Sequence, residues 1–98
     1  MSAELTPKQI ALVRLNYPPG TRIELIHMDD KWAVPSGTRG TVDLVDSIGQ
    51  IQMTWDNGRP LAIVPQVDSF RKLTQQEIQE EQQLKVLEQA ETITMDMM

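Results

Sequence analysis

The order of apolar and polar residues divides the chain into a helical start, a β-rich middle and a helical end. The segment Thr6-Pro7-Lys8-Gln9 supplies an N-cap residue, a proline at the first helical position and a glutamine that completes a capping box. Apolar side chains then follow at helical spacing until Pro18-Pro19-Gly20, which cannot continue a helix. The pattern predicts a short helix from residue 7 to about residue 16.

From Thr21 onward the hydrophobic period changes to two, the period of a β-strand. The stretch from Gln50 to Trp55 alternates polar and apolar side chains without a break, and the Asn57-Gly58 pair that follows is a strong hairpin signal. Five short strands are predicted in this region, at residues 22–26, 38–46, 50–55, 61–64 and 69–73. Closure into a barrel removes the exposed edges of such short strands. We therefore expect a mainly β fold, a small SH3-like five-stranded barrel, with a five-stranded OB-type barrel as the alternative.

A second capping box, from Thr74 to Glu77, predicts a helix that runs to about residue 90. Its first half contains a fully polar stretch, which should face water. Its second half and the tail carry an apolar stripe, formed by Val86, Ala90, Ile93 and Met97. This stripe needs a partner, either the barrel or another chain. Three segments result: 1–20 as an N-terminal helix and Pro-Pro-Gly lead-in, 21–73 as the barrel, and 74–98 as an acidic helix with a Met-rich tail.

Length and composition narrow the class of protein. A chain of 98 residues is long enough for one domain. The absence of cysteine excludes disulfides and thiolate metal sites and suits a reducing cytoplasm. With His27 as its one histidine, the sequence offers no cluster of metal ligands, so we expect neither a metal nor a cofactor. No signal-peptide pattern and no bilayer-length apolar run is visible, so we expect a cytoplasmic protein without membrane association.

The net charge of −5 is unevenly distributed along the chain. Residues 74–98 hold six acidic side chains and one lysine, so this segment alone accounts for the whole excess, while the middle is nearly neutral. A nucleic-acid-binding face would require the basic residues of the middle to gather in space. The residues in question are Arg22, Arg39, Arg59, Arg71 and Lys72.

Candidate catalytic groups are few. The aspartates, including Asp29-Asp30, are spaced as turn residues are rather than as an ion-binding loop. His27 has no evident partner for general base catalysis. The segment Gly37-Thr38-Arg39-Gly40 precedes a strand and so lacks the helix N-terminus that a phosphate loop uses. We therefore expect a protein that is not an enzyme.

Two groups of residues are candidates for binding a partner. Trp32 lies in a polar loop, where it either anchors a partner or folds back over an open barrel edge. Its neighbours Lys31, Asp29 and Asp30 would share the anchor role. An acidic helix can occupy a basic groove of another protein. The acidic candidates are Glu77, Glu80, Glu81 and Glu88. The other large aromatics, Trp55 and Phe70, are in register with inward-facing residues and are expected in the core.

Several motifs in order resemble one small bacterial family. They are Tyr17-Pro18-Pro19-Gly20-Thr21-Arg22-Ile23-Glu24-Leu25, Met28-Asp29-Asp30, Pro35-Ser36-Gly37-Thr38-Arg39-Gly40-Thr41-Val42, Trp55-Asp56-Asn57-Gly58 and Asp68-Ser69-Phe70-Arg71. The chain resembles domain-of-unknown-function family number 4314 from about Tyr17 to Leu73. The resemblance implies a protein of phages, plasmids or conjugative elements of Gram-positive bacteria. It brings no activity and no catalytic residues, and the segment from Thr74 lies outside it.

These observations favour a non-enzymatic binding module that acts on another protein. Its most concrete form is an inhibitor of a host defence nuclease, of the anti-CRISPR or anti-restriction type. A nucleic-acid-binding accessory factor that uses the basic residues of the barrel is the alternative, and a sponge for a signalling nucleotide is a further one. The apolar stripe of the last helix also predicts a homodimer as one way to cover it.

Overall fold

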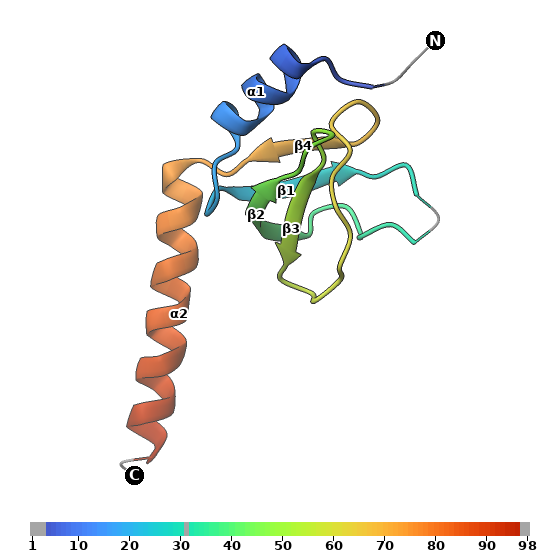
Figure 1. Ribbon diagram of the computed structural model, residues 1–98. Coiled ribbons are helices and arrows are strands. Elements are labelled where there is room, and N and C mark those ends of the chain that lie inside the picture. The colour runs from blue at the N-terminus through green and yellow to red at the C-terminus, as the bar shows by residue number, and fades with distance from the viewer. Residues whose placement is uncertain (1–3, 31, 97–98) are drawn as a thin grey trace.

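The computed structural model describes residues 4–30 and 32–96, and from residue 89 onward it describes the backbone without the side chains. Figure 1 shows a small β-sheet, a short helix above it and a long helix that projects from one end. In chain order the elements are α1 (Pro7–Asn16), β1 (Arg22–His27), β2 (Arg39–Val45), β3 (Ile51–Trp55), β4 (Ser69–Lys72) and α2 (Gln75–Asp96).

The four strands form one antiparallel sheet in the order β3-β2-β1-β4. The alternation that the sequence shows in β1 is present in space. Ile23 and Leu25 are buried, whereas Arg22 and Glu24 lie on the opposite face and are only partly covered. The sheet therefore has an apolar face that builds the core and a polar face that carries charged side chains.

The core is a single cluster of apolar side chains on one face of the sheet. Its largest fully buried members are Trp55, Ile23, Leu25, Ile51, Ile63, Val34 and Val42. Trp55 is in the core as expected, and its indole N–H donates to the carbonyl oxygen of Leu61 at 2.6 Å. Phe70 is partly buried at the edge of the cluster, where its ring centroid lies 5.3 Å from that of Tyr17.

The mainly β fold is confirmed, but the closed five-stranded barrel is not what these residues form. The segment predicted as a strand at 61–64 pairs with β3 through one isolated bridge, between Ile51 and Ile63. Pro60 and Pro65 bracket this segment and have no backbone N–H to donate. In addition, Trp55 takes the Leu61 carbonyl as its acceptor. Residues 4–30 and 32–96 thus fold as an open four-stranded sheet, neither SH3-like closure nor an OB-type barrel being present there.

Both helices begin at the capping boxes that the sequence contains. In α1 the Thr6 N–H donates to Gln9 Oε1 at 2.8 Å, and the Gln9 N–H donates to Thr6 Oγ1 at 3.2 Å. In α2 the corresponding pair is Thr74 and Glu77, at 2.9 and 3.1 Å. Helix α1 is fastened to the sheet by Arg14, which donates to the carbonyl oxygens of Val45 and Asp46.

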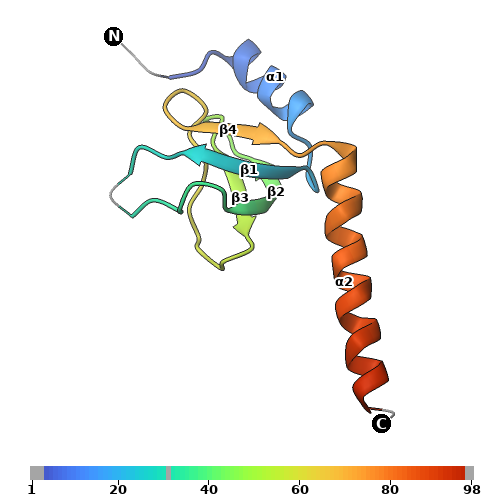
Figure 2. The same cartoon turned by 180° about the vertical axis from the view of Figure 1, so that it is seen from behind.

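Helix α2 extends away from the sheet. It is longer than predicted, and Figures 1 and 2 show from opposite sides that most of its length extends beyond the sheet. Leu73, directly before it, is buried and fixes its point of departure. Within the described part of the chain, no helix is both long and apolar enough to cross a membrane.

Candidate functional site

Three arginines meet on the polar face of the sheet. Arg22 comes from β1, Arg39 from β2 and Arg71 from β4, which are three adjacent strands. Glu24 of β1 is the register partner of both Arg39 and Arg71. Residues opposite one another in antiparallel strands share a face, so the pairing places the three guanidinium groups side by side.

Glu24 forms ion pairs with two of the arginines, Arg39 and Arg71. Its Oε1 accepts from Arg39 Nε at 3.1 Å, and its Oε2 accepts from Arg71 Nη2 at 3.1 Å. The third arginine, Arg22, is held from the side, because its Nη1 and Nη2 donate to the two carboxylate oxygens of Asp56 at 2.9 and 2.7 Å. Each guanidinium is thereby oriented by groups of the sheet and of the turn after β3.

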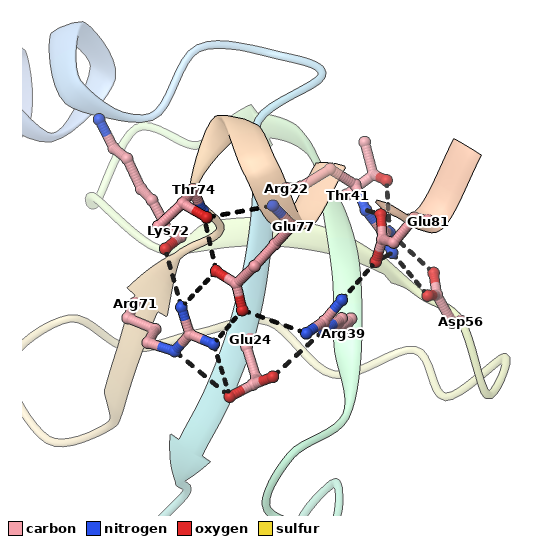
Figure 3. Close-up of polar contacts among 10 residues, drawn as sticks. All are labelled: Arg22, Glu24, Arg39, Thr41, Asp56, Arg71, Lys72, Thr74, Glu77 and Glu81. Carbon is pink, nitrogen blue, oxygen red and sulfur yellow. Dashed lines mark hydrogen bonds and ion pairs between the residues drawn. The ribbon is translucent and has the colours of Figure 1, made fainter. Parts of the chain in front are cut away.

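The first turns of α2 lie over this row and contribute two carboxylates, as Figure 3 shows. Glu77 accepts from Arg71 at 2.7 and 2.8 Å and from Arg39 at 3.2 Å. Glu81, one helical turn later, accepts from Arg22 at 2.8 and 3.1 Å and from Arg39 at 3.1 Å. Arg39 stands between the two carboxylates and contacts both.

The network shifts the acid–base properties of its members. Hydrogen bonds from Arg71, followed by one from the Thr74 N–H, lower the pKa of Glu77 to about 2. Hydrogen bonds from Arg22 lower the pKa of Glu81 and of Asp56 in the same way. The side chains stay partly open to solvent, between 19 and 55% exposed, so salt should weaken these contacts.

The predicted basic set divides in two. Arg22, Arg39 and Arg71 form the row just described. Lys72 points to the other side of β4, with its ammonium nitrogen 5.0 Å from the centroid of the Tyr17 ring. Arg59 lies away from the row and donates to the carbonyl oxygen of Trp32 at 3.1 Å. A single basic face made of all five residues is therefore not formed.

The predicted acidic set divides as well. Glu77 and Glu81 face the arginines, whereas Glu80 and Glu88 are exposed. The pairing of Glu77 and Glu81 with the arginines was not predicted from the sequence. A signal was present, because glutamates four residues apart share one face of a helix. What the sequence lacks is any indication that this face would meet β1, β2 and β4.

Trp32 does not fold back into the core. Its side chain is 66% exposed. Its backbone is ordered by an N–H donated to Asp30 Oδ1 at 2.7 Å, besides the bond from Arg59. Asp29 and Asp30 are exposed in the same loop, and Lys31 lies outside the described residues.

The outer face of α2 is apolar and open. Val86 and Leu87 are 63 and 59% exposed, and a shallow groove along the helix runs between these two side chains and three glutamines. Leu84 is 60% exposed but lies on the side of Glu81, near Arg22. Val86 follows Glu77 by nine residues, which is two and a half helical turns, so it lies on the side opposite the clamped carboxylates. The rest of the predicted stripe falls where side chains are not described, at Ala90 and Ile93, or outside the described residues, at Met97.

The side chains described, those of residues 4–30 and 32–88, include no group of three or more histidines, aspartates or glutamates that could hold a metal ion. His27 is exposed at the end of β1, opposite Ser69. Asp68, in contrast, is buried and accepts two backbone N–H groups, from Asp29 at 3.1 Å and from Val64 at 2.7 Å, so its role is to join loops.

Comparison with known proteins identifies the family of the domain. No curated protein and no solved structure matches the chain. The model of a domain of unknown function, DUF4314, matches residues 6–73. The match includes α1, the four strands and all three arginines of the row, and it ends before Glu77 and Glu81. Because this match spans most of the sequence, the chain belongs to the DUF4314 family.

Proposed function

We propose that this protein is a non-enzymatic module that binds another protein through the outer face of α2. The observation that carries the proposal is the orientation of this helix. Glu77 and Glu81 fix one side of α2 on the arginine row, and this turns Val86 and Leu87 away from the sheet. The domain cannot cover this apolar side without giving up the ion pairs.

The chemistry of the helix indicates the kind of partner. An exposed apolar strip on a helix fits an apolar groove of another protein. Glu80 is exposed on α2, and residues 74–98 together carry a charge of −5. A partner whose groove is flanked by basic groups is therefore favoured, while a second copy of the same acidic helix is disfavoured by repulsion. The exposed Trp32 is proposed as a further anchor, with Asp29 and Asp30 beside it.

A more specific form of the proposal is inhibition of a host defence nuclease, since the nucleic-acid groove of such an enzyme is basic. Glu80 is proposed to contact that groove, because Glu77 and Glu81 are paired within the chain and Glu88, seven residues after Glu81, lies on their side of the helix. Origin from a phage, a plasmid or a conjugative element, and a cytoplasmic location, remain predictions that fit this function. A nucleotide sponge also stays a prediction.

The test compares two matched pairs of substitutions in the full-length protein. Val86→Ser with Leu87→Ser changes the outer face of α2, and Leu15→Ser with Ile48→Ser changes equally exposed apolar residues elsewhere. Tagged protein is used to capture partners from host lysate treated with nuclease. The captured protein is then identified, purified and titrated against each variant by calorimetry.

We expect a purified basic partner to bind the wild-type protein and the control pair. We expect the α2 pair to weaken binding at least tenfold, because a small central apolar cluster usually dominates such an interface. Equal affinity of both pairs would refute the role of α2. Light scattering that shows a dimer of this chain, lost in the α2 pair, would instead make a second copy the partner.

A further inference from the structure

We propose that the arginine row, Arg22, Arg39 and Arg71, is a binding site for the phosphate backbone of a nucleic-acid strand. In this structure two carboxylates of α2 occupy the positions that the phosphate groups would take. Two anion positions are visible in Figure 3. Arg39 and Arg71 together hold Glu77, and Arg22 and Arg39 together hold Glu81. This inference does not depend on the partner proposed for the outer face of α2.

The contacts are of the kind that recognise phosphate. A guanidinium presents a planar fork of donors that fits carboxylate and phosphate alike. Arg71 grips Glu77 with both of its terminal nitrogens, at 2.7 and 2.8 Å. Arg22 grips Glu81 with Nε and Nη2, at 3.1 and 2.8 Å. A phosphate group in either position would accept hydrogen bonds from the same pairs of guanidinium nitrogens.

The arginines are oriented without the help of α2. Glu24 accepts from Arg39 and Arg71, while Asp56 and the Thr41 hydroxyl accept from Arg22. These acceptors belong to strands β1 and β2 and to the turn after β3. The positions of the guanidinium groups are therefore built into the domain and would persist if α2 moved away, which is the preorganisation that a binding site needs.

The cover is removable, because its attachment is small and polar. The four ion pairs between α2 and the sheet come from Glu77 and Glu81, and their side chains are about one-fifth exposed. Ile78 is only half-buried beside them, and Leu84, less than two turns later, is 60% exposed. Partly exposed ion pairs of this kind are weak individually and are screened by salt. Displacement of α2 requires no rearrangement of the apolar core.

The net charge around the arginine row depends on whether α2 covers it, and this charge determines which ligands can bind. With α2 in place, the three guanidinium groups meet four carboxylates, those of Glu24, Asp56, Glu77 and Glu81. With α2 displaced, two of these carboxylates leave and the face becomes positive. The covering segment also carries the charge of −5 that would repel a phosphate backbone. A nucleic-acid strand is favoured over an acidic protein because its phosphates repeat along the chain and can fill both positions in any register.

The test uses the full chain and a fluorescent single-stranded DNA of 20 nucleotides, with anisotropy as the readout. The variant Glu77→Ala with Glu81→Ala removes both covering carboxylates. The control, Glu4→Gln with Asp43→Asn, makes the same change in net charge at two exposed residues outside the arginine row. A third variant adds Arg39→Gln and Arg71→Gln to the first. Circular dichroism verifies that each variant is folded.

We expect the first variant to bind DNA at least tenfold more tightly than the wild-type protein at about 50 mM salt. Binding should weaken with salt with a logarithmic slope of about −1.4, as expected for two neutralised phosphates on a single strand. The control should behave as the wild-type protein does, and the third variant should lose the gain. Equal gains in the control, or no gain in a folded first variant, would overturn the proposal. Displacement of the DNA by an equal concentration of poly-glutamate would also overturn it, because the arginine row would then bind carboxylates as well as it binds phosphates.

Discussion

Replacement of Asp68 should have a larger effect on stability than its place in a polar loop suggests. Asp68 is 8% exposed, and its carboxylate accepts the N–H of Asp29 at 3.1 Å and the N–H of Val64 at 2.7 Å. Asp68→Ala leaves both partly buried N–H groups without this acceptor. A hydrogen bond to a charged group contributes about 1.5 to 3 kcal/mol, and water can reach part of this site, so we expect a loss of about 2 to 4 kcal/mol.

A series of three substitutions distinguishes the effect of losing the hydrogen bonds on stability from the effect of losing the negative charge. Asp68→Asn keeps one acceptor oxygen and should cost about half as much as Asp68→Ala. Asp43→Ala makes the same truncation at an exposed site where the carboxylate accepts from the Thr54 hydroxyl, and it should stay within about 0.5 kcal/mol of the wild-type protein.

Urea denaturation followed by tryptophan fluorescence is a suitable assay for this series. All variants should carry Trp32→Phe, so that the buried Trp55 is the one reporter of unfolding. If Asp68→Ala and Asp43→Ala lower the free energy of unfolding equally, water replaces the carboxylate without loss and the reasoning is refuted.

Three other predictions concern packing, pH and surface exposure. Gly40→Ala should destabilise the domain by about 1 to 3 kcal/mol, because a Cβ there would lie 2.8 Å from Trp55 Cε3 and 3.0 Å from the Thr54 carbonyl oxygen; an unchanged urea midpoint would contradict this. The low pKa of Glu77, about 2 against an ordinary 4.5, means that its contribution is complete above pH 4.5 and declines as the pH falls towards 2. The difference in melting temperature between wild type and Glu77→Gln should therefore shrink over this range, and a difference independent of pH would exclude the ion pairs as its cause. Trp32→Ala should change the free energy of unfolding by less than about 0.5 kcal/mol, because the ring is 66% exposed; a large fall would show that the ring supports the core.

The two faces of α2 connect the two proposals. The inner face holds the arginine row through Glu77 and Glu81, and the outer face presents Val86 and Leu87. A protein that draws α2 away from the sheet would uncover the arginines, so the two binding events would favour each other. A wild-type protein that gains affinity for DNA in the presence of its protein partner would show this coupling directly.

Local sequence determined where the regular elements begin and which strand residues enter the core. The capping boxes at Thr6 and Thr74 need partners only three residues away, so they are visible in the sequence and are found in the structure. The alternation of β1 and β3 likewise decides that Ile23, Leu25 and Trp55 are buried, because successive side chains of a strand point to opposite faces.

Tertiary structure decided what depends on contacts between distant segments. Residues 61–64 pair with β3 through one bridge, and the Leu61 carbonyl accepts from the Trp55 side chain, a tertiary contact that the alternating pattern of this segment does not show. Arg22 and Glu81 are 59 residues apart, so no local pattern shows that they meet. The sequence alone showed one set of acidic residues and one set of basic residues, each suggesting its own partner. Only the position of α2 over the sheet shows that members of the two sets neutralise each other, and that the apolar side of the helix is the one left open.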